Sequence, residues 1–127
     1  MEFPALLETD WELVVHRFPI SAEIPPSCFK SKFYSITRTE DELSIVCESS
    51  LDGVNSIRSE KGWRRLKVSG LLDFSLTGTM SAISGPLAAN GIPIFAISTF
   101  DTDYILIKAE RWKEGKQALT AAGFRFG

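Results

Sequence analysis

Residues 92–111 read IPIFAISTFDTDYILIKAER and contain two β-rich runs joined by a short polar turn. The runs are residues 92–97 and 104–108, and the turn is residues 98–103. Ile, Phe and Tyr favour a pleated, half-buried surface, whereas Ser, Thr and Asp favour turns, so the segment is predicted to be a β-hairpin. Its turn holds more hydroxyl and carboxylate groups than a chain reversal needs. This end of the sheet is therefore a candidate place to hold a small polar ligand.

The composition is that of a globular domain without an affinity for polyanions. The chain has 127 residues, which suffice for one ordinary core or two small ones. Its net charge of −2 argues against a nucleic-acid partner, because such partners require clustered Lys and Arg. No apolar run approaches the roughly 18 residues of a membrane span, and the start lacks the order of a secretion signal. We expect a cytoplasmic protein with no nucleic-acid and no membrane partner.

The residues that usually carry catalysis or bind metals are scarce. Cys28 and Cys47 are expected to be reduced core residues rather than a disulfide, and two Cys with one His cannot supply the usual zinc-ligand spacings. The single histidine, His16, lies in a β-rich run and is predicted to be structural. Because no nucleophile stands beside a base, we expect no enzyme activity, no metal and no cofactor.

Outside the hairpin, two helices and several strands are predicted. The helix at residues 80–90 contains Pro86, which is expected to interrupt or kink it. The run after Pro25 and Pro26 forms at most one helical turn, and residues 51–62 are ambiguous. The remaining elements are strands at 11–18, 33–38, 43–47, 63–70 and 124–126 and a helix at 112–122.

An internal repeat relates the two halves of the chain. A shift of 61 residues places 33–46 on 94–107, with Ile36 on Ile97, Thr37 on Ser98 and Gly62 on Gly123. The pattern predicts an α+β fold of two tandem ferredoxin-like (βαββαβ) units, residues 1–62 with a degenerate first helix and residues 63–127 complete. Seven strands are visible where two units need eight. Either one sheet is a strand short, or strands are exchanged between the halves.

Two segments resemble the ACT-domain family, and specifically the small tandem-ACT proteins related to CASTOR-type amino-acid sensors. They are FYSITRTEDELSIVC in the first half and WRRLKVSGLLDFSLTGTMSAISGPLAANGIPIFAISTFDTDYILIK in the second. The resemblance implies a regulatory module that binds a small molecule, commonly an amino acid, at an interface between ACT units. It also implies a homo-oligomer and a protein partner that the sequence does not identify.

The resemblance places the ligand between the loop that leads into the first helix and the turn of the second hairpin. Backbone N–H groups at the helix start suit a ligand carboxylate, and a turn carboxylate, Asp101 or Asp103, suits its ammonium group. Thr99 and Phe100 would line the pocket. The implied ligand-binding residues are Asp73, Leu76, Thr77, Gly78, Thr79, Met80, Ser98, Thr99, Phe100, Asp101 and Asp103.

Several alternatives stay open. Arginine sensors of this pattern carry an acidic residue where this chain has Leu76, which favours a neutral ligand over a basic one. The polar turn residues can instead serve only the turn, which would leave a non-catalytic assembly module with a vestigial pocket. A ferredoxin-like RNA-binding domain would use Phe33, Tyr34 and Phe95, but the acidic charge balance disfavours it. In the 61-residue register Arg38 and Thr39 replace Thr99 and Phe100, so a single site is assigned to the second hairpin.

Overall fold

The computed structural model describes residues 3–69 and 78–127, and these residues form two compact units. The N-terminal unit is Trp11–Trp63, and the C-terminal unit combines Met1–Asp10 with Arg64–Gly127. The boundary between residues 63 and 64 falls one residue after the boundary expected from the repeat. The first ten residues, however, group with the C-terminal unit and not with the half of the sequence in which they stand.

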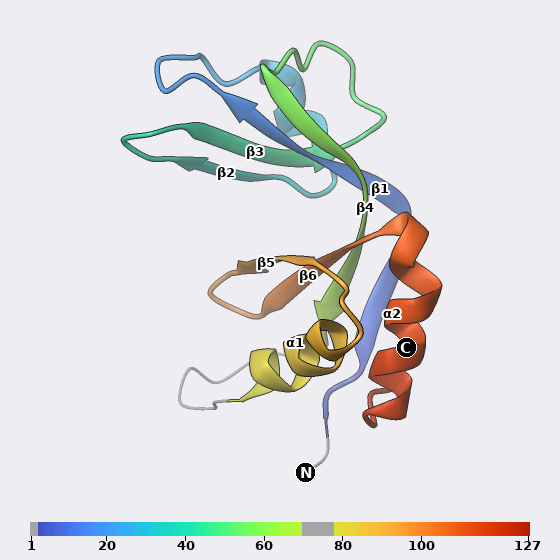
Figure 1. Cartoon of the computed structure of the whole chain (residues 1–127). Coiled ribbons are helices and arrows are strands. Elements are labelled where there is room, and N and C mark those ends of the chain that lie inside the picture. The colour runs from blue at the N-terminus through green and yellow to red at the C-terminus, as the bar shows by residue number, and fades with distance from the viewer. Residues whose placement is uncertain (1–2, 70–77) are drawn as a thin grey trace. The chain divides into compact units, whose positions relative to one another are not determined.

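The N-terminal unit is a sheet with almost no helix. Its strands follow the order β2-β3-β1-β4, and β3 pairs antiparallel with both β1 and β2. A short 3₁₀ helix begins at Pro26, the second of the two adjacent prolines, and is the helical stub that the sequence predicts. The elements are β1 (Leu6–Phe18), η1 (Pro26–Lys30), β2 (Ser35–Arg38), β3 (Leu43–Glu48) and β4 (Arg58–Val68) (Figure 1).

The C-terminal unit combines a sheet with two helices. Its strands follow the order β1-β4-β6-β5, and β5 and β6 form the antiparallel hairpin expected at residues 92–111. The elements that belong to this unit alone are α1 (Thr79–Ala89), β5 (Ile94–Ser98), β6 (Asp103–Lys108), η2 (Ala109–Arg111) and α2 (Trp112–Ala121).

Two long strands belong to both units. Residues 6–10 of β1 lie in the C-terminal unit and residues 11–18 in the N-terminal one, while β4 changes unit after Trp63. The described residues therefore form six strands. Each unit contains four of them, because β1 and β4 each contribute one part to each unit. The final strand expected at residues 124–126 is wrong: only Phe126 forms a bridge, to Leu6, because β1 already occupies the position beside β4.

Each unit has its own buried cluster. Alternating residues of β3 supply the N-terminal cluster, and alternating residues of β4 and β6 supply the C-terminal one, because residues two apart in a strand share a face of the sheet. The N-terminal cluster contains Phe18, Cys28, Leu43, Ile45 and Cys47. The C-terminal cluster contains Leu6, Leu66, Val68, Ile83, Leu87, Ile92, Ile105, Ile107, Trp112, Leu119 and Phe124.

The helices end where the sequence predicts, but Pro86 does not interrupt α1. The helix is continuous, because proline removes only the N–H group that would bond to the carbonyl of Ala82. Asn90 closes the helix by donating its side-chain amide to the carbonyl of Pro86, at 2.8 Å. The stop glycines Gly91 and Gly123 have φ values of 67° and 105°, which suit glycine. Residues 51–57 contain no helix, and β4 begins five residues before the predicted strand.

The two hairpins correspond in a different register from the predicted one. The N–H of Thr39 donates to the carbonyl of Glu42, and that of Thr99 to the carbonyl of Thr102, each at 2.9 Å. Thr39 and Glu42 stand 60 residues before Thr99 and Thr102, not 61. Because a slip of one residue turns every strand side chain to the opposite face, the 61-residue register is wrong for the hairpins.

Burial supports the 60-residue register independently. Ile45 faces the core of the N-terminal unit, and its partner in this register, Ile105, faces the core of the C-terminal unit. The 61-residue spacing is supported by the match of Gly62 with Gly123, but these glycines occupy different places, one within β4 and one after α2. The corrected register pairs Thr39 with Thr99, Asp41 with Asp101, Arg38 with Ser98 and Leu43 with Asp103.

Candidate ligand-binding site

The start of α1 can accept an anion. Gly78 precedes the helix with a φ of 93°, a conformation that other residues adopt only with strain, and its carbonyl accepts the N–H of Ala82 at 2.8 Å. Among the described residues no side chain caps this end, and no acidic residue stands in the first turn. The first N–H groups of a helix lack partners within the helix, and its dipole is positive there. This end therefore suits a carboxylate from outside the chain.

A hydroxyl and a carboxylate face each other where the β5–β6 hairpin ends. Ser98 lies directly opposite Asp103, and its hydroxyl donates to the Asp103 Oδ1 atom at 2.6 Å. Asp103 lies on the same face of β6 as Ile105 and Ile107, which contact the buried cluster shared with α1. The second carboxylate oxygen of Asp103 can accept further hydrogen bonds from a cationic donor.

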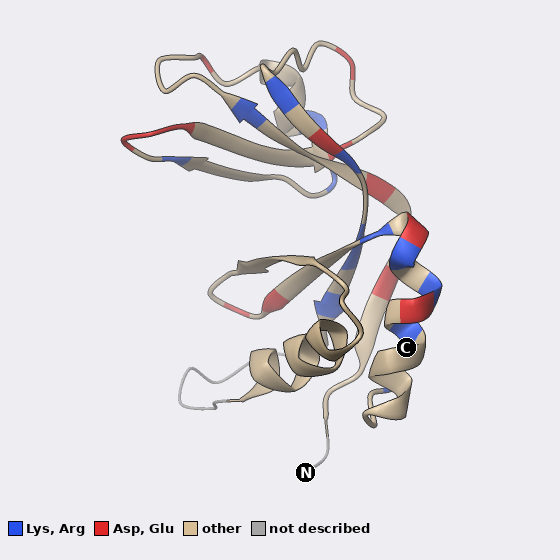
Figure 2. Cartoon of the chain, viewed as in Figure 1, with Lys and Arg blue, Asp and Glu red and all other residues tan. Residues whose placement is uncertain are grey.

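Both features lie in the C-terminal unit, and Figure 1 shows the β5–β6 turn and the start of α1 on the same side of it. Met80 packs against the buried cluster from the first turn of the helix. Neither α1 nor β5 carries a charged residue, as Figure 2 shows. Asp103 is thus the charged group of the described site, and a ligand ammonium would meet no competing lysine or arginine from these two elements.

The hydroxyl of Thr99 serves the turn. It donates to the carbonyl of Thr102 at 3.1 Å and accepts the N–H of Thr102 at 3.4 Å. Thr39 does the same in the N-terminal hairpin, where its hydroxyl accepts the N–H groups of Asp41 and Glu42 at 3.1 and 3.2 Å. Because both turns use the same threonine in the same way, Thr99 is explained by the fold and needs no ligand.

One residue of this turn was missed by the sequence reasoning. Thr102 is buried, and its hydroxyl donates to the carbonyl of Val68, the last residue of β4, at 2.8 Å. The bond joins the turn to the strand end that leads towards the start of α1. An isolated threonine in a polar turn gives no sequence signal for this contact, because the partner lies 34 residues earlier in the chain.

The remaining candidates separate into two groups. Phe100 and Asp101 form the tip of the turn and are exposed, with Phe100 81% exposed. Asp101 corresponds to Asp41 of the other hairpin, which is also exposed. Three further candidates, Asp73, Leu76 and Thr77, lie outside the described residues. The described site therefore narrows to Gly78, Thr79, Met80, Ser98 and Asp103.

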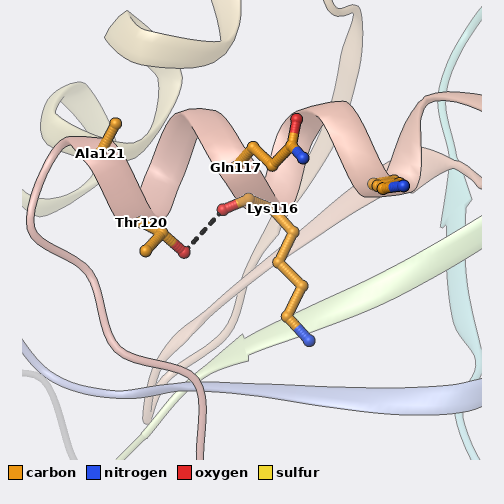
Figure 3. Close-up of a pocket in the computed structure, with 5 residues that line it drawn as sticks. Lys116, Gln117, Thr120 and Ala121 are labelled. Atoms are coloured by element: carbon orange, nitrogen blue, oxygen red, sulfur yellow. Dashed lines mark hydrogen bonds between the residues drawn. The ribbon is translucent and has the colours of Figure 1, made fainter.

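A hollow elsewhere on the surface is a weaker candidate. It has a volume of about 390 Å³ and opens along one face of α2 (Figure 3). Two of its polar side chains have partners: the hydroxyl of Thr120 donates to the carbonyl of Lys116 at 2.8 Å, and the Lys116 ammonium pairs with Glu8 at 2.5 Å. All its lining residues come from one helix, and none was predicted from the sequence. They are Lys113, Lys116, Gln117, Thr120 and Ala121.

The residues with catalytic side chains serve the N-terminal unit's structure. His16 is buried, its Nδ1 atom lies 2.9 Å from the Ser56 hydroxyl, and burial with nearby Lys61 lowers its pKa. The thiols of Cys28 and Cys47 are free and buried, and burial raises the pKa of Cys47 to about 12, so it is not a nucleophile at neutral pH. In residues 3–69 and 78–127, no three acidic, histidine or cysteine side chains are grouped to hold a metal.

The chain belongs to the ACT-domain family, because the family model described as "ACT domain" matches residues 58–121. A second family model, which describes an N-terminal domain, matches residues 12–54. The relatives include the "Cytosolic arginine sensor for mTORC1 subunit 1" of Pongo abelii, 31% identical over 72% of this chain, and that of Homo sapiens, 30% identical over 68%. This chain spans 30% and 29% of their respective lengths.

Solved structures agree with this assignment. A crystal structure of a protein from Agobacterium tumefaciens has a TM-score of 0.90 and 34% identity, and the match covers 100% of this chain and 94% of that one. The ligand-free regulatory subunit of aspartate kinase from Thermus thermophilus shares the fold, with a TM-score of 0.63, 10% identity and coverage of 95% and 99%. The named relatives are a sensor and a regulatory subunit. No helix within the described residues is long and apolar enough to cross a membrane.

Proposed function

We propose that this protein is a small-molecule sensor of the ACT type and that it binds an amino acid at the end of the C-terminal unit. The ligand carboxylate binds the N–H groups at the start of α1, and the ligand ammonium binds Asp103, which Ser98 orients. The observation that carries the proposal is the Ser98–Asp103 pair, because it places a carboxylate on the helix-covered face of the sheet, where the matching hairpin has Arg38 and Leu43.

A neutral ligand side chain fits this site best. No charged residue occurs from Phe74 to Phe100. The helix and strand that border the site therefore offer no ionic partner for a charged ligand side chain, in addition to the ligand carboxylate and ammonium groups. Because relatives are named as arginine sensors, an amino acid is a reasonable class of ligand. Leu76 favours an amino acid with a neutral side chain. In this proposal the protein acts through a protein partner or its own oligomer, in the cytoplasm.

The architecture that we propose for this function is two tandem ferredoxin-like ACT units, the first with a degenerate helix, that share β1 and β4. The equal strand order in the two units supports it. In this architecture residues 1–62 and 63–127 are the two copies of the sequence repeat. The compact units differ from these copies, because β1 and β4 each contribute one part to each unit.

The direct test is a thermal-shift screen of the twenty amino acids at millimolar concentration, followed by calorimetry of any that stabilise the protein. A ligand at 100 times its Kd stabilises the folded state by about 2.7 kcal/mol, which is readily measured. Asp103→Asn should weaken binding by at least tenfold, because it removes the ionic partner of the ammonium group.

The chain provides a matched control for this variant. Asp101→Asn changes the same side chain two residues earlier, at the exposed tip of the turn, and should leave binding unchanged. Equal effects of the two variants would contradict the assignment of Asp103. If none of the twenty amino acids stabilises the protein, the sensor proposal fails, and an assembly module with a vestigial pocket becomes the better description.

A further inference from the structure

Most of the large apolar side chains that the described residues expose belong to the N-terminal unit. They are Ile20, Phe29, Tyr34 and Ile57, whereas Phe100 belongs to the C-terminal unit. Single exposed apolar residues are common on soluble proteins, but residues in mutual contact form a patch, and patches often mark an interaction surface. Phe29 and Tyr34 form such a patch: they are 54% and 45% exposed, and their rings lie 5.5 Å apart in an edge-to-face contact.

This aromatic pair lies where the N-terminal unit has only a short helix. Residues of two α-helices belong to the buried cluster of the C-terminal unit, whereas the cluster of the N-terminal unit contains one helical residue, Cys28 of η1 (Figure 1). Cys28 is fully buried, but the next residue, Phe29, is half-exposed. Tyr34 comes directly before β2, the edge strand of this sheet. Because η1 ends at Lys30, the two rings stand at the margin of the sheet and remain open to solvent.

Hydrogen bonds fix the segment that joins the two rings. The hydroxyl of Ser31 donates to the carbonyl of Phe33 at 2.6 Å and accepts the N–H of Glu48 at 2.9 Å. The N–H of Lys32 donates to the Glu48 Oε2 atom, also at 2.9 Å. These bonds tie the segment to the end of β3 and use neither ring of the aromatic pair. A surface that is already ordered loses little conformational freedom when a partner binds, which favours association.

The surface around the aromatic pair is positively charged. Residues 24–39 contain Lys30, Lys32 and Arg38 and no acidic residue, although the whole chain has a net charge of −2. Among the described residues Lys30 has no ion-pair partner, and the Lys32 side chain is 71% exposed although its Nζ atom lies 3.9 Å from Glu48. The Glu48 side chain is only 10% exposed, so solvent meets the ammonium groups and not the carboxylate. Aromatic anchors inside a polar rim are the usual anatomy of a protein-binding surface.

We infer that Phe29, Tyr34, Lys30 and Lys32 form a docking surface for an acidic segment of a protein partner. The segment carries one aromatic or aliphatic side chain between carboxylates. Its apolar side chain packs on the aromatic pair, and its carboxylates bind the two ammonium groups through charge-assisted hydrogen bonds. The inference goes beyond the proposed ligand site, which lies in the other unit, because it assigns the surface by which the protein reaches its partner.

The number of cations favours a protein over a polyanion. RNA is held by many Lys and Arg contacts to phosphate, and an anionic membrane surface by clusters of roughly four to eight basic residues. This docking surface offers two lysines, because the guanidinium of Arg38 already donates to the carbonyls of Ile20 and Ala22. Two ammonium groups beside an apolar patch instead match a short peptide with a carboxylate on each side of its anchor.

Selection of random peptides displayed on phage against the full chain tests the inference, with fluorescence polarisation of the enriched peptides as the quantitative measurement. The enriched peptides should carry Asp or Glu around an aromatic or aliphatic residue. Phe29→Ser should weaken their binding more than tenfold, because it removes half of the apolar contact. Lys30→Glu should do the same, because it turns an attraction into a repulsion. A second selection, on the Lys30→Glu protein, should no longer enrich acidic peptides.

Matched variants make the same chemical changes elsewhere. Ile57→Ser removes an exposed apolar side chain beside β4, at the other end of the strand order from β2, and Lys113→Glu reverses an exposed charge on α2. Both should leave peptide binding unchanged. Circular dichroism with thermal melting verifies that every variant is folded, which the exposure of all four side chains leads us to expect.

Three outcomes overturn the inference. The first is a selection that enriches no peptide, or only neutral and basic ones. The second is an enriched peptide that binds Phe29→Ser as tightly as the wild type. The third is binding of a labelled RNA oligonucleotide or of phosphatidylserine vesicles that Lys30→Glu abolishes, since the surface would then serve a polyanion. The amino-acid thermal-shift screen on Phe29→Ser should match that of the wild type, so failure of the docking surface is observed separately from failure of the ligand site.

Discussion

The β2–β3 and β5–β6 hairpins have the same turn but differ in the pair of residues that flanks it. Each turn begins with a threonine whose hydroxyl accepts the N–H three residues later, at 3.2 Å in the first hairpin and 3.4 Å in the second. At the pair of residues that precedes and follows the turn, however, the first has Arg38 and Leu43, and the second has Ser98 and Asp103.

In the proposed function, this difference separates a structural hairpin from a ligand-binding one. Leu43 is fully buried, and Arg38 ties its hairpin to the loop after β1. Asp103 and Ser98 instead bond to each other and contribute polar atoms to the same face of the sheet. A polar pair in place of an apolar contact costs packing, so the C-terminal hairpin gives up stability that its counterpart keeps. Such a local departure from the packing pattern is expected at a binding site.

Exchanging the residue after the turn tests this contrast and should give the largest effect. Leu43→Asp would bury a carboxylate without a partner and should destabilise the protein by about 4 kcal/mol. The reciprocal change, Asp103→Leu, should leave stability equal or raise it while it abolishes amino-acid binding. Urea denaturation measures both free energies of unfolding. Comparable losses in the two variants would show that Asp103 is as structural as Leu43.

The last turn residue provides the next test. Thr102→Val should cost about 1.5 kcal/mol, because it leaves the buried carbonyl of Val68 without its hydrogen bond at 2.8 Å. The residue at the same place in the other hairpin, Glu42, is half-exposed and lies 3.8 Å from Arg17. Glu42→Gln should therefore change stability by less than about 0.5 kcal/mol. Guanidinium denaturation curves of the two variants compare them directly, and equal costs would contradict the role of Thr102.

The first turn residue tests the register of the repeat. Thr39→Ala and Thr99→Ala should each cost about 1 kcal/mol, because both remove the same hydroxyl from the same place in the turn. In the 61-residue register Thr39 would correspond to Phe100, and Phe100→Ala should change stability little, since its side chain is 81% exposed. Chemical denaturation of the three variants distinguishes the two registers. A large loss of stability in Phe100→Ala would contradict the 60-residue register.

The smallest effect concerns pH. Burial and nearby Lys61 lower the pKa of His16, so the unfolded chain binds the proton more readily than the folded one. The stability contributed by neutral His16 is complete above the unfolded pKa of about 6.5 and is lost as the pH falls through the lower folded value. Hydrogen exchange at pH 7 and pH 5 should show β1 and β3 losing protection relative to β6, and His16→Gln should reduce that difference.

Local patterns predicted much of this fold. Alternating apolar residues located both hairpins, and Gly91 and Gly123 marked the ends of the two helices. The extended parts of β1 and β4 were missed because residues 8–10 and 58–61 are polar. Glu8 is held by Arg64 at 3.5 Å and by Lys116, contacts between residues far apart in the sequence. Hydrophobic periodicity does not detect a strand that is stabilised by long-range ion pairs.

The site was predicted less completely than the fold. Asp103, the helix start and Thr99 were all placed in the candidate site by the resemblance, and the hydroxyl of Thr99 proves to bond within the turn. The predicted register of the repeat hid the equivalence of Thr99 and Thr39. Gly62 and Gly123 supported a shift of 61 residues, whereas the hydrogen bonds of the two turns require 60. A letter-by-letter match cannot detect this slip, because both registers align apolar residues with apolar residues.

The strands that serve both units determine the order in which the protein can fold during synthesis. Residues 6–10 leave the ribosome first, yet they complete the unit that contains Arg64–Gly127. The N-terminal unit can assemble as soon as the first half of β4 has been made, while these early residues wait for the second half. Long-range pairing of this kind slows folding. A truncated chain that begins at residue 11 would retain every strand of the N-terminal unit but leave the C-terminal sheet with an unpaired edge at β4.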